Sequence, residues 1–251
     1  MWENRDYFVD CDGIDIHVKL DFPKEQKEKM PLLIVISGLT GHMEEDHIIA
    51  VAKAANEIGF ATLRGELYGH GKSGGKFYDH TVMHWMLETM RLIDHASELP
   101  FVSDIYLSGH SQGGLTAALG AGLKPVSVKA LLLLAPAMNI WVGARKGELF
   151  GMKFDPEDLT KEFGESDWRV SSNYLRAARI LPVEEAVRNY HGPVLIVHGT
   201  ADESVPYHFG ADLVTKYEHA ELVTIEDEDH CYTRHLDQVT AAVQRFLEEQ
   251  R

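Results

Sequence analysis

The strongest indication of the fold comes from residues 105–114, Ile105-Tyr106-Leu107-Ser108-Gly109-His110-Ser111-Gln112-Gly113-Gly114. An apolar run leads into the pattern Gly109-x-Ser111-x-Gly113, and further small residues follow it. A serine on a sharp strand-to-helix turn needs neighbours without side chains two positions before and after it, because a Cβ there would collide with the turn. The stretch therefore predicts a strand, a strained turn that exposes the Ser111 hydroxyl, and a helix.

Apolar runs like the one before Ser111 recur along the chain, and helical patterns separate most of them. The runs cover residues 32–36, 60–63, 130–134, 194–197 and 222–225. The helical patterns cover residues 47–58, 81–99, 113–123, 207–217 and 235–249. Continuous apolar runs are typical of strands covered on both faces, and their alternation with helices favours right-handed crossovers. The sequence therefore predicts an α/β fold with a mostly parallel, wound sheet.

Two segments depart from that alternation. Residues 14–20 alternate apolar and polar side chains after the turn Cys11-Asp12-Gly13, which predicts a hairpin near the start of the chain. Residues 137–181 are far too many for a short loop and one helix, and connections of that length in a compact domain are usually functional. We expect a core of residues 1–136 and 182–251, with residues 137–181 inserted as a cap over the carboxyl edge of the sheet, where functional residues gather.

Composition excludes several classes of function. The 251 residues carry 39 Asp and Glu against 24 Lys and Arg, a net charge of −15, which disfavours nucleic acids and anionic membrane surfaces as partners. The longest apolar run falls short of the roughly 20 residues of a membrane span, and the first residues do not form a secretion signal. Two cysteines fit a reducing compartment, and we expect Cys231 to be a small buried residue. We therefore expect a cytoplasmic protein; the sequence leaves its oligomeric state open, a homodimer included.

The Ser111 hydroxyl becomes a useful nucleophile when a base takes its proton, and the base in turn needs an acid that orients it. After a turn of this kind the order along the chain is Ser, then Asp or Glu, then His. Asp202 comes just after the run 194–197, and His230 comes after the run 222–225. The sequence therefore predicts Ser111, Asp202 and His230 as a catalytic triad. The alternatives are Glu203 for the acid, and His219 and His235 for the base.

Acyl transfer also needs hydrogen-bond donors for the negative charge that develops on the carbonyl oxygen. One donor is expected from the backbone N–H of Gln112, directly after the candidate nucleophile. The second is expected from the loop after the run 32–36, where the N–H of Leu39 is the best candidate. The predicted oxyanion hole thus consists of two backbone groups from two different loops.

Two patterns point to cofactors, and neither holds. Gly69-x-Gly71-x-x-Gly74 matches a dinucleotide fingerprint, but polar residues follow it where an apolar helix should open. His80 and His84 could share a helix face as metal ligands, yet the sequence offers no third ligand near them. We therefore expect neither a metal nor an organic cofactor.

Over nearly its whole length the sequence resembles the α/β-hydrolase superfamily. Four segments carry the resemblance: Ser37-Gly38-Leu39, Tyr68-Gly69-His70-Gly71-Lys72-Ser73, Gly109-His110-Ser111-Gln112-Gly113, and His198-Gly199-Thr200-Ala201-Asp202 with Val205-Pro206. Within the superfamily the chain is similar to the bacterial cinnamoyl or feruloyl esterases, which carry a small insertion after the sixth strand. Many relatives have His-Gly where this chain has Ser37-Gly38.

The resemblance implies a serine carboxylic-ester hydrolase that releases hydroxycinnamic acids such as ferulate, p-coumarate and caffeate through an acyl-enzyme. The aromatic-rich insertion would then hold the phenylpropenoyl group, with Asp155, Trp168 and Tyr174 as candidate contacts. The nearest rival is a general carboxylesterase or monoacylglycerol lipase with the same triad. A rival of another class is a binding protein without catalytic activity on the same scaffold.

Overall fold

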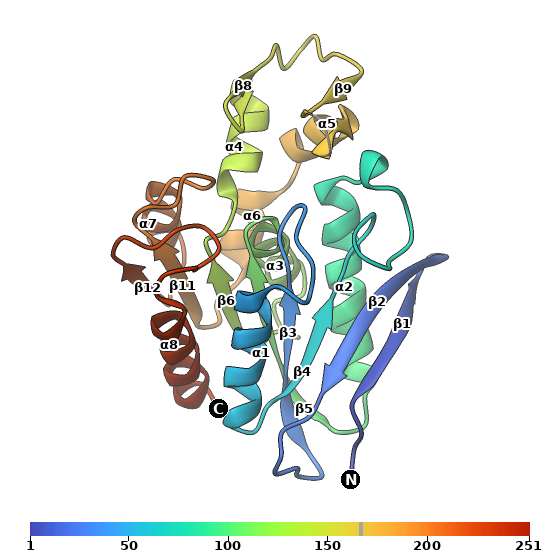
Figure 1. The fold of residues 1–251 in the computed structure, drawn as a ribbon, viewed down its shortest axis with the longest axis vertical. Coiled ribbons are helices and arrows are strands. Elements are labelled where there is room, and N and C mark those ends of the chain that lie inside the picture. Colours follow the sequence, from blue (N-terminus) through green and yellow to red (C-terminus); the bar gives the residue numbers. More distant parts are fainter. Residues whose placement is uncertain (166–167) are drawn as a thin grey trace.

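A central sheet of eight strands organises the molecule, and the computed structural model describes residues 1–165 and 168–251 (Figure 1). The strands are β1 Arg5–Cys11, β2 Ile14–Asp21, β3 Met30–Ile36, β4 Ala61–Gly65, β5 Val102–His110, β6 Ala130–Leu134, β11 Val194–Gly199 and β12 Ala220–Ile225. Their spatial order is β1-β2-β4-β3-β5-β6-β11-β12. The pairs β1–β2 and β2–β4 are antiparallel, and the other neighbouring strands are parallel. The prediction of a mostly parallel, wound sheet is therefore confirmed.

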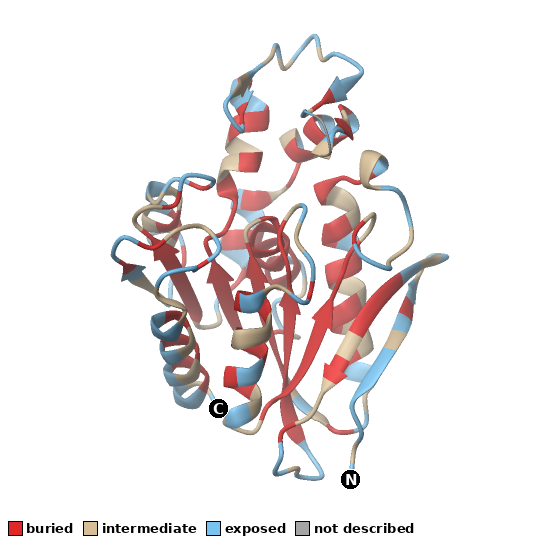
Figure 2. Cartoon of the chain, viewed as in Figure 1, coloured by how far each residue is buried: buried red, intermediate tan, exposed pale blue. Residues whose placement is uncertain are grey.

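Helices cover both faces of this sheet. On one face lie α1 Asp46–Glu57 and α8 Leu236–Glu249; on the other lie α2 Val82–Glu98, α3 Gln112–Leu123 and α6 Val183–Asn189. In β3, Leu33 and Val35 pack in the core under α1 and α8, whereas Leu32 and Ile34 pack in the opposite core. Successive side chains of a strand point to opposite faces, so a strand buried on both sides must be apolar throughout. Figure 2 shows β3, β4, β6 and β11 buried along their length.

The predicted hairpin and the predicted helices are present, with small changes at their ends. The hairpin β1–β2 turns at Asp12 and Gly13, both with positive φ. Helix α7, His208–Val214, connects β11 to β12 and is shorter than the pattern over 207–217 suggested. Helix α6 was not predicted; Gly122 of α3 lies against it so closely that a Cβ there would come within 2.1 Å of the Ala186 carbonyl oxygen.

Residues 137–181, here called the cap segment, rise above the carboxyl ends of the parallel strands (Figure 1). The segment contains α4 Met138–Lys146, the two-residue strands β7 Glu148–Leu149, β8 Met152–Lys153, β9 Glu162–Phe163 and β10 Val170–Ser171, and α5 Asn173–Arg179. Phe163 packs with Phe154 and Trp168 at ring distances of 5.5 and 6.0 Å, and Phe150 packs on Trp168 at 5.6 Å. Part of the aromatic content of the cap segment thus serves its own small core.

Within the described residues, no helix combines the length and the hydropathy needed to cross a membrane.

Candidate active site

Ser111 lies at the point where β5 ends and α3 begins, in a strained backbone conformation with φ 55° and ψ −121°. A Cβ on Gly109 would lie 2.1 Å from the carbonyl oxygen of Gly113, and one on Gly113 would lie 2.4 Å from that of Ser37. Both contacts are with backbone atoms, which cannot swing away as a side chain can. The turn therefore excludes side chains at both positions, as the sequence pattern predicted, and the strain is of the kind found at functional sites.

His230 follows β12 in the chain and contacts Asp202, which follows β11. The distance between His230 Nδ1 and Asp202 Oδ2 is 2.7 Å, and the two side chains are 16% and 0% exposed. An ionised carboxylate only accepts hydrogen bonds, so His230 donates from Nδ1 and keeps the lone pair on Nε2. His230 and Ser111 line the same cavity. The structure thus brings the three predicted triad residues to one site.

Asp202 is buried, yet its surroundings favour the charged form. Its Oδ1 accepts the backbone N–H groups of Ser204 at 2.9 Å and Val205 at 2.8 Å, and its Oδ2 lies 3.3 Å from Nε2 of His198. Burial alone would raise the pKa of Asp202, but the hydrogen bonds from His198 and His230 outweigh it and hold that pKa well below its usual range. Asp202 is therefore ionised at neutral pH, and these hydrogen bonds hold it in place.

Two further histidines, His110 and His47, form a hydrogen-bonded chain that ends on the backbone of His230. His110 donates from Nε2 to the carbonyl oxygen of His230 at 2.8 Å, so its Nδ1 is the acceptor for His47 Nε2, 3.1 Å away. Burial lowers the pKa of His47 to about 4 and places that of His110 well below its usual value. Both rings are therefore neutral, and they link the end of β5 to the loop that carries the candidate base.

The alternative acid and bases have less suitable surroundings than Asp202 and His230. Glu203 is exposed and lines the cavity, while Asp202 beside it turns inward to His230. The His219 side chain is 64% exposed and lies beside Glu218, and His235 precedes the first residue of α8. The geometry favours Asp202 and His230 for these two positions.

The loop after β3 lies directly against the candidate nucleophile. A Cβ on Gly38 would lie 2.9 Å from Cβ of Ser111, so the backbone of Gly38 touches that side chain. Leu39 follows in this loop, and Gln112 is the first residue of α3, where helix N–H groups have no acceptor in the preceding turn. In the part of the chain that the structure describes, the N–H groups of Leu39 and Gln112 have no hydrogen-bond acceptor. Both are therefore available to a ligand oxygen.

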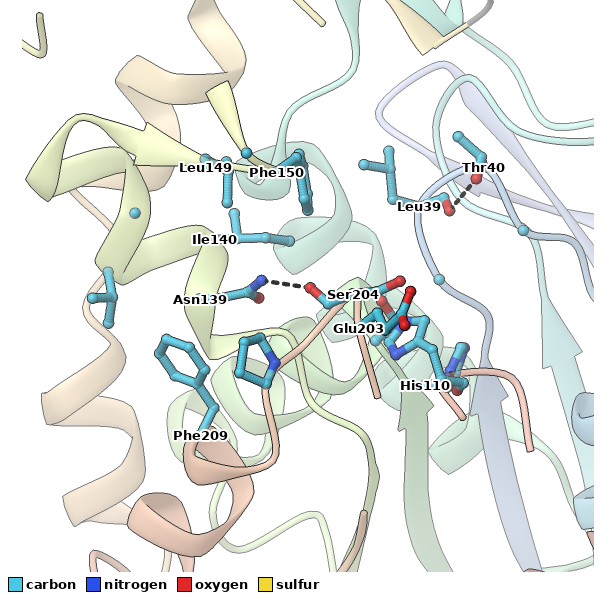
Figure 3. Close-up of a pocket in the computed structure, with 18 of the residues that line it drawn as sticks. Leu39, Thr40, His110, Asn139, Ile140, Leu149, Phe150, Glu203, Ser204 and Phe209 are labelled. Atoms are coloured by element: carbon cyan, nitrogen blue, oxygen red, sulfur yellow. Dashed lines mark hydrogen bonds between the residues drawn. The ribbon is translucent and has the colours of Figure 1, made fainter. Parts of the chain in front are cut away.

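These elements surround a cavity of about 950 Å³ between the core and the cap segment. Figure 3 shows Leu39 on one side of it, and Ile140, Leu149 and Phe150 on the cap side. Asn139, from α4, donates from Nδ2 to the carbonyl oxygen of Ser204 at 3.0 Å and so ties the cap segment to the loop after β11 (Figure 3). The cavity is large enough for an aromatic acyl group, and its cap side is mainly apolar.

The three candidate substrate contacts in the cap segment have different surroundings. Trp168 lines the cavity. Tyr174 is 1% exposed, and its hydroxyl donates to Oε1 of Gln112 at 2.7 Å, so it supports the residue that carries one oxyanion donor. Asp155 is exposed and accepts the N–H of Glu157 at 2.9 Å in a turn. Of the three, Trp168 is thus the one that the structure places at the cavity wall.

Three further side chains stand out whose roles the sequence did not reveal. His80 donates from Nδ1 to the carbonyl oxygen of Phe77 at 3.2 Å, and its Nε2 accepts from Nε2 of Gln112 at 3.3 Å; burial lowers its pKa to about 3. His70 contacts the loop after β3 and is considered below. Cys231 is exposed and lines the cavity, so the expectation of a buried cysteine was wrong. Its position beside His230, on a loop at the cavity, accounts for the exposure.

The histidines weighed as metal ligands serve as packing and hydrogen-bonding groups. His84 stacks on the ring of Tyr68 at 4.3 Å, and both nitrogens of His80 are engaged as described above. Among residues 1–165 and 168–251, no group of three His, Cys, Asp or Glu side chains is placed to hold a metal ion.

Comparisons with known proteins show which families and solved structures this chain resembles. Residues 27–155 match the family described as serine aminopeptidase, S33, and residues 169–251 match the family described as TAP-like protein. The solved structure of Est1E from Butyrivibrio proteoclasticus with ferulic acid bound is 49% identical, with a TM-score of 0.95, over 97% of this chain and 98% of that one.

A more distant relative is the mitochondrial palmitoyl-protein thioesterase ABHD10 of Rattus norvegicus. It is 26% identical over an alignment of 227 positions, which covers 85% of this chain and 71% of that protein. The solved mouse ABHD10 structure superposes with a TM-score of 0.79 at 19% identity, over 98% of this chain and 100% of that one, and so shares the fold.

Proposed function

We propose that this chain, which belongs to the α/β-hydrolase superfamily, is a serine esterase that releases hydroxycinnamic acids such as ferulate from their esters. The observation that carries the chemistry is the meeting of Ser111, on its strained turn, with His230 and the buried Asp202 at one cavity. The observation that supports the acyl group is the 49% identity to Est1E, a protein solved with ferulic acid bound.

In the proposed acylation step, Ser111 Oγ attacks the ester carbonyl carbon while Nε2 of His230 takes the hydroxyl proton. The imidazolium that forms is stabilised by the ionised Asp202 on its Nδ1 side, 2.7 Å away. His230 then gives the proton to the alkoxide oxygen as the C–O bond breaks, so the alcohol leaves neutral. The products of this step are the free alcohol and an ester between Ser111 and the acid.

In the proposed deacylation step, water takes the place of the alcohol. His230 Nε2 removes a proton from the water, the hydroxide attacks the acyl carbon, and the proton passes to Ser111 Oγ as it leaves. The carboxylic acid is released and the enzyme returns to its starting state. In both steps negative charge develops on the carbonyl oxygen, where the N–H groups of Leu39 and Gln112 are available to receive it.

The cap segment is the proposed wall of the acyl site. In this proposal, residues 1–136 and 182–251 form the catalytic core, and residues 137–181 form a cap subdomain that closes the cavity over the carboxyl edge of the sheet. Ile140, Leu149, Phe150 and Trp168 give that wall its apolar and aromatic character, which suits a phenylpropenoyl group better than a charged acid.

The test measures kcat/KM of the purified protein on three substrates: methyl ferulate, a medium-chain monoglyceride and a palmitoyl thioester. The thioester is included because the rat relative is named a palmitoyl-protein thioesterase. We expect methyl ferulate to exceed both others by at least about tenfold, a difference of about 1.4 kcal/mol in transition-state binding. A monoglyceride or thioester that is turned over faster than methyl ferulate would contradict the proposed acyl specificity.

The matched control is a pair of serine variants three residues apart. Ser111→Ala is expected to abolish turnover of all three substrates while the protein stays folded. Ser108 lies buried in β5, and its hydroxyl has no hydrogen-bond partner among the described residues. Ser108→Ala should therefore keep the activity of the unaltered protein. Activity that survives in Ser111→Ala would mean that another residue is the nucleophile.

A further inference from the structure

The loop that carries the Leu39 N–H is a tight turn in a strained conformation. Gly41 donates its N–H to the carbonyl oxygen of Gly38 at 3.1 Å, which closes a four-residue turn. Thr40, the third residue of that turn, has φ 63°, a left-handed conformation that branched side chains rarely adopt. A turn of this kind normally has glycine or asparagine at this position. Contacts outside the turn must therefore hold Thr40 in place.

One such contact comes from His70, which lies in the long loop between β4 and α2. The backbone N–H of Thr40 donates to Nε2 of His70 at 3.1 Å. Nδ1 of the same ring lies 3.1 Å from the carbonyl oxygen of Tyr68, which can only accept. The two contacts together require a neutral imidazole with its proton on Nδ1 and its lone pair on Nε2, directed at Thr40.

The His70 ring is itself held firmly. It is 4% exposed and packs against the indole of Trp85 at 4.7 Å and the ring of Phe77 at 5.1 Å. Trp85 also donates from Nε1 to the carbonyl oxygen of Tyr68 at 3.1 Å, so it fixes the group that sets the tautomer. Burial lowers the pKa of His70, which keeps the ring neutral. The acceptor offered to Thr40 is therefore held in one orientation and is neutral at neutral pH.

The second end of the same peptide unit is also fixed. The hydroxyl of Thr40 donates to the carbonyl oxygen of Leu39 at 2.6 Å (Figure 3). The Leu39–Thr40 peptide is thus held through its N–H by His70 and through its C=O by the Thr40 side chain. Leu39 lies between this fixed peptide and Gly38, whose backbone touches Ser111. The direction of the Leu39 N–H depends on both neighbours.

We propose that His70 is a positioning residue of the oxyanion hole: its neutral ring accepts the Thr40 N–H and holds the turn 38–41 so that the Leu39 N–H faces the reacting carbonyl oxygen. The inference rests on the proposed ester hydrolysis, for which it supplies a residue outside the triad. It also gives a physical role to one residue of the segment Tyr68–Ser73, which the triad chemistry leaves unused.

The test compares His70→Phe, which keeps the packing but removes the acceptor, with His70→Gln, whose amide oxygen can take the place of Nε2. Each is assayed on p-nitrophenyl acetate and on its thiono analogue, whose sulfur accepts hydrogen bonds poorly. For His70→Phe we expect kcat on the oxygen ester to fall about 10- to 100-fold with KM within about threefold, because an oxyanion contact acts in the transition state. The thiono ester should lose less than about threefold, and His70→Gln should restore most of the kcat.

The matched control is His95→Phe. His95 is a half-buried histidine on α2 that bonds to the Tyr7 hydroxyl at 2.8 Å. This variant should leave kcat on both esters unchanged. The proposal is overturned if His70→Phe keeps the kcat of the unaltered protein, or if the oxygen and thiono esters lose activity by the same factor. A purely structural role of His70 would give that last result.

A second measurement needs no variant and is independent of the reaction. Long-range ¹H–¹⁵N NMR of the folded protein should show His70 as the Nδ1–H tautomer across neutral pH. A proton on Nε2 of His70 would overturn the proposal even if the chain hydrolyses esters well. The correct tautomer together with no turnover of methyl ferulate or p-nitrophenyl acetate would instead contradict the proposed function, while His70 would still hold the Thr40 N–H as proposed.

Discussion

A serine hydroxyl has no special reactivity of its own, and at Ser111 the surroundings supply what the residue lacks. Its backbone has the strained φ of 55°, on a turn that leaves no room for side chains at Gly109 and Gly113. The candidate base, His230, is oriented at Nδ1 by Asp202 and at its backbone by His110. Each of these contacts comes from a buried or half-buried partner, which makes the arrangement rigid before any substrate binds.

One buried carboxyl group, that of Glu88, should make the stability of the protein depend on pH. Glu88, on α2, is 3% exposed and accepts the N–H of Tyr68 at 2.7 Å; burial raises its pKa to about 7 from 4.5. Because the folded state holds the proton more tightly than the unfolded state, this contribution to stability is complete below pH 4.5 and is lost as the pH rises through 7. Relative to Glu88→Gln, the unaltered protein should therefore lose up to about 3 kcal/mol of unfolding free energy between pH 5 and pH 8.

Urea unfolding of both proteins at the two pH values measures this difference. The variant keeps a neutral side chain of the same shape, so it serves as the reference at each pH. A stability difference between Glu88→Gln and the unaltered protein that is the same at pH 5 and at pH 8 would show that Glu88 does not titrate in this way.

At the scale of elements, the site depends on how closely α3 approaches the loop after β3. Gly113, in the first turn of α3, faces the carbonyl oxygens of Ser37 and Ile36, and a Cβ there would come within 2.4 and 2.6 Å of them. The helix can therefore place the N–H of Gln112 beside Ser111 and still touch the loop that carries Leu39. Helix α3 and the loop after β3, which are far apart in the sequence, can come into backbone contact because residue 113 has no side chain.

Gly113→Ala should separate these elements. The added methyl group meets backbone atoms, so we expect a loss of about 1–3 kcal/mol of stability from overpacking and at least about a tenfold loss of kcat on methyl ferulate from the displaced donors. Gly120→Ala, two turns further along α3, is the matched control, because its Cβ would first meet the side chain of Thr89. Thermal unfolding and steady-state kinetics of the two variants measure both effects. Equal kcat values for the two variants would show that the close contact between α3 and the loop after β3 does not position the donors.

The sequence predicted the elements that have a strong pattern and missed those that lack one. The apolar run before Ser111 and the alternation of strands and helices were sufficient for the sheet. Helix α6 and the strands of the cap segment are short. A two-residue strand such as β7 or β9 is too short to show the alternation of apolar and polar residues by which strands are recognised. The sequence pattern could not predict the orientation of Tyr174, because an aromatic residue in an insertion can face either a ligand or the core. In the structure its hydroxyl donates to Gln112.

The same limit applies to the histidines around the site. Ser111, Asp202 and His230 could be proposed from residue type and order, because each follows a strand and the carboxyl ends of parallel strands meet at one edge. His47, His70 and His80 have no such signature, since their partners are backbone groups and side chains of other elements, namely β5, the loop after β3 and α3. Which ring nitrogen donates depends on those partners, and this is fixed by the tertiary structure alone.

At the scale of the whole molecule, one edge of the sheet gathers every group that the proposed reaction uses. The loops after β3, β5, β11 and β12 all leave the sheet at its carboxyl edge, and the cap segment lies above them (Figure 1). Tyr174 of the cap segment bonds to Gln112, and Asn139 bonds to the loop after β11. The cap segment is thus joined by hydrogen bonds both to the oxyanion side and to the acid side of the site.

Labelling by a fluorophosphonate probe, with its site and rate read by peptide mass spectrometry, tests whether Ser111, His230 and Asp202 act together. We predict one label per chain, on the peptide that contains Ser111. Labelling should be at least about 100-fold slower in Asp202→Asn, because the wrong tautomer of His230 then faces the serine. A label on another residue would contradict the account, as would full-speed labelling of Asp202→Asn together with slow labelling of Glu203→Gln.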